Sequence, residues 1–216
     1  LNEIWNNQNL KNKDLNNLNS FFWLFSLDLK SSKKETQDVI LKWIEKNHRY
    51  SSKCWETDIT AKRIIVWISN SKLTYEDGDT VYKEKFNQII KKQTNHLINE
   101  IEKSESVDDK MVGCAAIILV GLSYQDKNNY LNLGLSLLKK IIKFSFDNDG
   151  FPKSRNIRQL NFYLKYFVLI REWLKESQNE IPEYIDENIY YLGQAYAFIW
   201  KNNKKDILFN GNHESN

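Results

Sequence analysis

Apolar residues recur every three to four positions along most of the chain, the spacing that puts them on one face of an α-helix. No window alternates with the period of two that is typical of a β-strand. The spacing predicts helices over residues 15–29, 33–48, 57–69, 80–101, 108–124, 130–146, 156–176 and 183–200. Ser32, with Glu35 three residues later, forms a capping box that marks the start of the second helix.

The segment 108–124 differs from the others because it is apolar on nearly all sides. Such a helix is buried by its neighbours, and its small residues permit close helix contact; these are Gly113, Ala115, Ala116 and Gly121. Short polar connections between the predicted helices favour antiparallel hairpins. We therefore expect an all-α fold in which antiparallel helical hairpins form an incomplete α/α toroid. A length of 216 residues fits a single domain over 1–216.

Composition and charge narrow the possible partners. The net charge of +3 comes from 31 basic and 28 acidic residues, and lysine pairs are scattered near acidic residues. This pattern is typical of solvated helix faces, so we expect no nucleic-acid partner. The longest apolar run, 111–122, is too short to span a membrane. Cys54 and Cys114 lack the spacing of a metal site, so we interpret them as small apolar residues and expect no cofactor in this chain.

The connection 147–156 is the first candidate for function. Its Asp-Gly and Pro residues are typical of a turn, and a calcium-loop interpretation fails because the required carboxylates are missing. A turn alone does not account for Arg155 and Asn156, which stand just before an aromatic-rich helix. The guanidinium of Arg155 can form a bidentate pair with a carboxylate or a sulfate. The alternative is that both residues only shape the start of the helix.

A second candidate is the segment 54–67. Trp55 lies in a connection, and Arg63 and Trp67 lie in the following predicted helix. An exposed Trp beside an Arg suits a sugar, since the ring stacks on the apolar sugar face and the guanidinium pairs with an acidic group. In the alternative interpretation Trp55 covers the core, and Arg63 pairs with Glu56 or Asp58.

The third candidate follows the last helix, at 207–214. Asn210 and Glu214 surround His213, whose imidazole has an ordinary pKa of about 6.5 and suits proton transfer. An exposed histidine without a role is the alternative. His48 and His96 lie in polar helical contexts and indicate no catalytic role. The sequence shows no motif of a Ser-His-Asp catalytic triad, no phosphate-binding glycine loop and no HExxH motif.

Taken in order, short motifs along the whole chain resemble the N-terminal helical part of the bacterial heparinase II/III-like proteins. The loop at 149–156 resembles that family's Asp-Gly-Gly-His…Ser-Arg-Asn-Pro loop, and 209–211 resembles its Phe-Asn-Gly signature. The remaining motifs are 22–24, 43–44, and Trp55 with Arg63 and Trp67, which is similar to the family's Trp…Arg…Trp stretch.

The resemblance implies an α/α toroid followed by an antiparallel β-domain, with a possible metal in the β-domain. It also implies polysaccharide lyase chemistry on polymers that contain uronic acid, such as glycosaminoglycans. This chain is then a fragment, expected to be inactive without its β-domain, from the bacterial periplasm or cytoplasm. The residues expected to contact the acidic polysaccharide are Trp55, Arg63, Trp67, Arg155, Asn156, Asn210 and Glu214, with His213 for proton transfer.

The sequence departs from the family pattern in two places. Phe151 and Pro152 follow Gly150, where the family loop has a histidine. The tyrosine that lyases carry shortly after the loop serine is also missing, and the nearest is Tyr163. Two alternatives therefore stay open. One is a non-catalytic carbohydrate-binding or envelope-assembly protein with the same toroid, and the other is an unrelated helical interaction scaffold.

Overall fold

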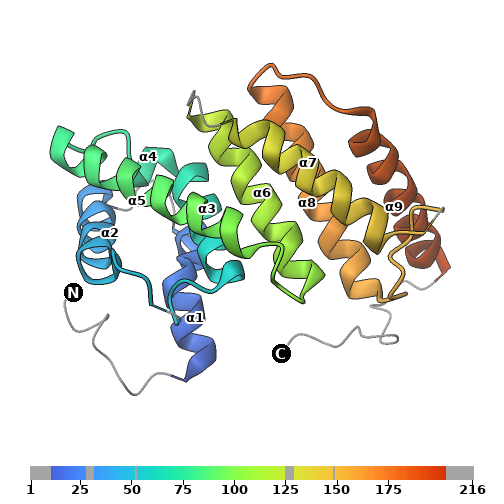
Figure 1. Ribbon diagram of the computed structural model, residues 1–216, viewed down its shortest axis with the longest axis horizontal. Coiled ribbons are helices and arrows are strands. Elements are labelled where there is room, and N and C mark those ends of the chain that lie inside the picture. Colours follow the sequence, from blue (N-terminus) through green and yellow to red (C-terminus); the bar gives the residue numbers. More distant parts are fainter. Residues whose placement is uncertain (1–10, 28–31, 52, 125–128, 148, 203–216) are drawn as a thin grey trace. The chain divides into compact units, whose positions relative to one another are not determined.

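The computed structural model describes residues 11–27, 32–51, 53–124, 129–147 and 149–202, and every regular element in these ranges is helical (Figure 1). This confirms the predicted all-α class. In the same ranges no helix combines the length and the apolar character needed to cross a membrane. The chain divides into two compact units, Leu1–Ser104 (unit 1) and Glu105–Asn216 (unit 2), which are described separately. The single domain over 1–216 and the toroid stay predictions.

In the described part of unit 1, the helices predicted over 33–48, 57–69 and 80–101 are found with bounds within one residue of the prediction. The Ser32 hydroxyl accepts a hydrogen bond from the Glu35 N–H at 3.3 Å, so the predicted cap is confirmed. Asp79 caps a later helix by accepting from the Tyr82 N–H at 2.8 Å. The elements are α1 (Asn12–Ser20), the 3₁₀ helix η2 (Phe22–Ser26), α2 (Lys33–Asn47), α3 (Thr57–Ser69), α4 (Ser71–Thr74) and α5 (Thr80–Glu100).

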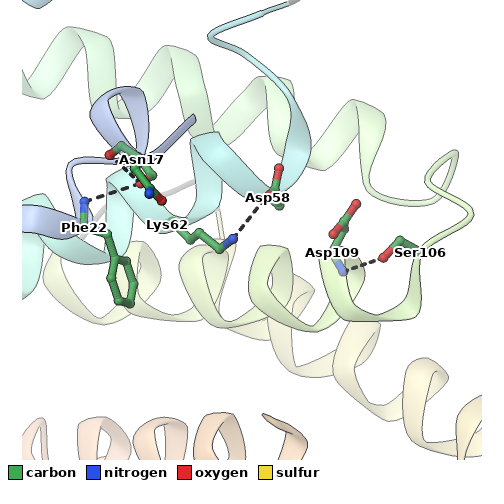
Figure 2. Close-up of polar contacts among 7 residues, drawn as sticks. Asn17, Phe22, Asp58, Lys62, Ser106 and Asp109 are labelled. Atoms are coloured by element: carbon green, nitrogen blue, oxygen red, sulfur yellow. Dashed lines mark hydrogen bonds and ion pairs between the residues drawn. The ribbon is translucent and has the colours of Figure 1, made fainter. Parts of the chain in front are cut away.

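The predicted helix over 15–29 is broken at Phe21. This residue has a left-handed backbone with φ of 57°, which ends α1 and leads into η2. The hydroxyl of Ser20 donates to the Asn17 carbonyl at 3.0 Å and accepts from the Phe22 N–H at 3.4 Å, as Figure 2 shows. The Phe21 ring is fully buried. Burial of this large ring offsets the cost of the unusual backbone, which periodicity alone does not reveal.

An aromatic cluster forms the core of unit 1. The Trp43 and Trp67 rings meet edge to face with centroids 5.5 Å apart, and Phe21 lies 5.0 Å from Trp67. Phe86 of α5 completes the cluster, 5.5 Å from Trp67. The Trp43 Nε1 donates to the Asn19 Oδ1 at 2.9 Å. The cluster thereby joins α1, α2, α3 and α5 around one core.

The described residues of unit 2 form four long helices, whose bounds lie within two residues of those predicted. The Ser106 hydroxyl accepts from the Asp109 N–H at 3.2 Å and caps the first of them (Figure 2). Helices α7 and α8 pack on α6, and α9 packs on α8 (Figure 1). The elements are α6 (Val107–Ser123), α7 (Tyr130–Ser145), α8 (Ile157–Glu176) and α9 (Glu183–Asn202).

Helices α6 and α7 approach each other closely at two glycines. A Cβ atom on Gly121 would lie 2.4 Å from the Leu131 nitrogen, and one on Gly134 would lie 2.6 Å from the Ile118 Cγ1. As α7 advances from Leu131 to Gly134, its contacts move back along α6 from Gly121 to Ile118, so the two helices form an antiparallel hairpin. Residues 111–120 of α6 are all buried, as the sequence predicted.

Candidate carbohydrate-binding site

Arg63 lies inside unit 1, fully buried on α3. Its Nε donates to the Gln93 Oε1 at 2.8 Å, and one terminal nitrogen donates to the carbonyls of Asn19 at 2.7 Å and Cys54 at 3.0 Å. The other terminal nitrogen donates to the Thr60 hydroxyl at 3.3 Å. Burial lowers the pKa of Arg63 from its ordinary value to about 9, so the group remains charged at neutral pH.

This burial corrects the expectation that Arg63 contacts a polysaccharide. The guanidinium stacks on Trp43, with its carbon 4.0 Å from the ring centroid, and its donors bind acceptors within the protein. The alternative partner Asp58 pairs instead with Lys62 at 2.9 Å (Figure 2). Apolar residues on both sides of Arg63, from Ile59 to Trp67, already indicated a helix with little exposed surface.

Trp55 and Trp67 are buried as well. Trp55 is 2% exposed, and its Nε1 donates to the Asn47 carbonyl at 3.1 Å. Trp67 belongs to the aromatic core. A ring with no exposed face cannot stack on a sugar, so the structure supports the alternative interpretation in which Trp55 covers the core. Neither ring therefore offers a face to a ligand at the surface of unit 1.

The connection between α7 and α8 in unit 2 is a turn organised by Asp147. The Asp147 Oδ1 accepts from the N–H groups of Asp149 at 3.1 Å and Phe151 at 2.8 Å. Phe146 and Pro152 form an isolated antiparallel bridge that closes the turn. Gly150 has φ of 73°, a conformation that favours glycine. The turn interpretation of this segment is therefore confirmed.

Arg155 stands at the end of this turn with an exposed side chain. Its φ of 56° is unusual for a residue with a side chain, and its N–H donates to the Pro152 carbonyl at 2.9 Å. One terminal nitrogen lies 2.7 Å from the Asp147 Oδ2, and the guanidinium carbon lies 5.3 Å from the centre of the Phe151 ring. The Arg155 side chain is nevertheless 59% exposed. The turn thus presents a guanidinium to solvent in a defined position.

Asn156 begins α8, as the structural interpretation predicted. Its Oδ1 accepts from the Arg158 N–H at 2.9 Å, and its own N–H donates to the Ser154 hydroxyl at 3.2 Å. The carboxamide oxygen of Asn156 is used in this cap, and Arg155 directly precedes it in the chain. Arg158 follows on the same turn with an exposed side chain.

Loss of this cap has a measurable consequence. We expect Asn156→Ala to lower the free energy of unfolding by about 1 kcal/mol, because an N–H of the first turn loses its acceptor. Urea unfolding followed by circular dichroism measures the change. Asn161→Ala, at an exposed position inside α8, is the matched control and should not destabilise the protein. Equal losses in the two variants would contradict the role of Asn156 as a cap.

Tyr191 of α9 is a surface residue that the sequence analysis missed. A Cβ on Gly150 would lie 2.6 Å from the Tyr191 Cβ, so the turn rests directly on this tyrosine. Tyr191 is 46% exposed, and the neighbouring Tyr190 is 62% exposed, with the two ring centroids 5.5 Å apart. Nothing in the spacing of α9 marks the pair, because contact with Gly150 depends on how α9 folds back along α8.

The candidate site therefore consists of the described residues of the 146–156 turn, with Arg155, and of Tyr191, which lies against Gly150, with its neighbour Tyr190. It combines an exposed cation with exposed aromatic rings, the two groups that an acidic sugar requires. Lys153 of the turn and Arg158 in the first turn of α8 are also exposed and add positive charge. Asp147 is the acidic residue that pairs with Arg155.

Tyr163, the nearest tyrosine to the loop, is held inside the protein. Its side chain is 1% exposed, and its hydroxyl donates to the Asp108 Oδ1 at 3.1 Å. The Gln159 Nε2 donates to the same oxygen at 2.9 Å. Burial, together with the charge of Asp108 and the hydrogen bond to it, raises the pKa of Tyr163 well above its ordinary value. This arrangement does not offer Tyr163 as a proton donor to a substrate.

Asn210, His213 and Glu214 lie outside the described residues, so their expected roles stay predictions. Within the described ranges, no three His, Cys, Asp or Glu side chains gather as a metal site would require. Cys114 is buried, as expected, and Cys54 is partly buried.

Comparisons of the chain with protein-family models, with curated proteins and with solved structures gave no match. The heparinase II/III-like resemblance therefore rests on the sequence motifs alone and stays a prediction.

Proposed function

We propose that this chain is the helical part of a polysaccharide lyase-like protein and that it binds acidic polysaccharide through the 146–156 turn. The observation that carries the proposal is the exposed Arg155, held at a positive φ at the end of a turn whose Gly150 lies against the exposed Tyr191 of α9. The guanidinium pairs with a uronate carboxylate or a sulfate, and the tyrosine rings pack on the sugar faces.

The proposed reaction is β-elimination. The C5 proton of a uronate is weakly acidic, and its removal requires a cation or a hydrogen-bond donor on the neighbouring carboxylate. Arg155 is suited to that contact. A base must then take the proton, and an acid must protonate the leaving oxygen. We assign proton transfer to His213 and to groups of the expected β-domain. The complete protein is then expected to release unsaturated uronate products, detected by their ultraviolet absorbance.

Non-catalytic binding is the second candidate, and two observations favour it. Phe151 and Pro152 occupy the place of the family's loop histidine, and the hydroxyl of Tyr163 is bound to Asp108. In this case the same turn binds acidic carbohydrate without cleaving it. Binding with no absorbance change on heparan-, alginate- or hyaluronan-like polymers would support this candidate over the lyase.

The Arg155 contact can be tested on the chain itself. We expect Arg155→Ala to weaken binding of a uronate oligosaccharide by more than about 1 kcal/mol, because a charge-assisted pair is lost. Isothermal titration calorimetry measures the affinity. Arg155→Gly should weaken binding equally. Because glycine adopts a positive φ without strain, an equal loss in both variants attributes the effect to the missing guanidinium and not to a change in the turn.

Lys153→Ala is the matched control for Arg155, since it removes one positive charge from the same segment. We expect it to weaken binding much less than Arg155→Ala. Unchanged affinity in both Arg155 variants would rule out the proposed contact, and equal losses for Lys153 and Arg155 would reduce it to general charge attraction.

A further inference from the structure

Unit 1 contains a surface groove that the proposed site in unit 2 does not use. The groove lies between α2 and α5 and has a volume of about 350 Å³. Ile44 and Ile89 are buried at its apolar floor. The remaining lining residues are polar or charged, and they are Glu45, His48, Lys85, Gln88 and Lys92. A volume of this size holds one sugar ring with its substituents.

The charged groups of the groove are fixed by local contacts. Lys85 pairs with Glu45 at 3.2 Å, and the Lys92 ammonium donates to the His48 carbonyl. The His48 Nδ1 lies 2.9 Å from the Glu45 carbonyl. Two lysines against one glutamate leave an excess of positive charge, while Gln88 offers both a donor and an acceptor at an exposed position.

An exposed aromatic residue lies at the Lys92 end. The Lys92 ammonium is 5.8 Å from the centre of the Trp55 ring, and the Tyr50 ring is 6.3 Å from Trp55 on centroids. Tyr50 is 65% exposed and also packs 5.1 Å from His96. The His96 Nε2 lies 2.9 Å from the Trp55 carbonyl, which fixes the imidazole. The buried Trp55 ring therefore packs beneath Lys92 and Tyr50 at this end of the groove.

The lining selects among ligand classes. An inorganic anion would use the lysines but not the apolar floor. A fatty acid would use the floor and one lysine but would desolvate Glu45 and Gln88 without a partner. An acidic sugar uses every group, because its apolar face covers Ile44 and Ile89, its hydroxyls pair with Glu45 and Gln88, and its carboxylate or sulfate meets the lysines.

We propose that the α2–α5 groove is a second binding site for an acidic sugar residue, with Lys92 and Lys85 recognising the acidic group. The sugar class rests on the function proposed above, whereas the groove and its charges belong to unit 1 alone.

The test is a titration of the isotope-labelled chain with a hyaluronan tetrasaccharide, followed by amide NMR shifts, with sulfate and the neutral cellotetraose as comparison ligands. We expect shifts in 44–48 and 85–92 for the acidic tetrasaccharide. Lys92→Gln and Lys85→Gln should each weaken this binding about three- to fivefold. Gln88→Ala should weaken it without a change in net charge. Lys91→Gln is the matched control, since Lys91 is adjacent to Lys92 but does not line the groove.

The outcomes separate the two proposals. Shifts at 146–156 without shifts at the groove overturn the second site and leave the proposed function standing. NMR shifts in the groove residues, together with an unchanged affinity of Arg155→Ala for the acidic oligosaccharide, support the second site and contradict the contact at Arg155. Equal losses for Lys91→Gln and Lys92→Gln, or sulfate shifts as large as those of the tetrasaccharide, overturn the groove as a sugar site. Absence of any shift contradicts both.

Discussion

Replacing Arg63 with alanine is expected to lower the free energy of unfolding of unit 1 by about 3 kcal/mol or more. The change removes four hydrogen bonds and leaves the Asn19 and Cys54 carbonyls and the Gln93 side chain without their donor. It also opens a cavity beside Trp43. Removal of a buried charge recovers part of its desolvation cost, but the unpaired acceptors and the cavity outweigh that gain.

Urea unfolding followed by tryptophan fluorescence measures this loss, because Trp43, Trp55 and Trp67 all lie in the core of unit 1. Lys62→Ala is the matched control. It removes a cation from the adjacent position of α3, and its surface pair with Asp58 should contribute less than about 1 kcal/mol. A loss of under about 1 kcal/mol in Arg63→Ala would contradict the structural role assigned to this residue.

The pH dependence of the same variant follows from the pKa of Arg63. Burial lowers this pKa to about 9, below that of the unfolded chain, so both states hold the proton at lower pH. The stability difference between the natural chain and Arg63→Ala is therefore expected to stay constant between about pH 6 and 8. Above about pH 9 the folded state releases the proton first, so the penalty for burying the charge decreases as pH rises.

Gly121→Ala is expected to destabilise unit 2 by about 2 kcal/mol or more, because the added methyl group meets backbone atoms rather than a flexible side chain. The new Cβ would lie 2.4 Å from the Leu131 nitrogen and 2.7 Å from its Cα, so α6 and α7 must separate. The higher helix propensity of alanine returns only about 1 kcal/mol. Thermal unfolding measured by circular dichroism detects the difference.

Gly193→Ala is the matched control for this substitution. Gly193 also lies inside a helix of unit 2, but a Cβ there would meet nothing within 4 Å. We expect this variant to be as stable as the natural chain or more stable, by up to about 1 kcal/mol. A Gly121→Ala variant that gains stability in the same way would show that α6 and α7 are not in close contact.

The helices could be predicted from the sequence because periodic apolar residues and capping side chains are local signals. Thr57–Ser69 has the bounds that its spacing predicts, and Ser32 caps α2 as the pattern required. The break at Phe21 was missed, because it depends on rings contributed by α2 and α3. The short α4 was missed as well, since four residues carry too little periodic signal.

The candidate site was predicted less well. Arg155 and Asn156 were found because turn residues and a helix start are visible in the sequence, and Asn156 proved to be the cap. Arg63 and Trp55 were expected at a surface, although a polar side chain among apolar neighbours is equally consistent with burial. Tyr191 and the α2–α5 groove depend on contacts between helices far apart along the chain, and no local pattern encodes those contacts.

We expect the hydrogen bonds of Arg63 to make the folding of unit 1 cooperative. Its acceptors come from the end of α1, from the connection before α3, and from α5. A partly folded form that keeps α3 packed but releases α1 or α5 would hold a dehydrated cation with missing acceptors. Such forms are disfavoured, so the amide protons of these segments should exchange with solvent together, through a single opening event.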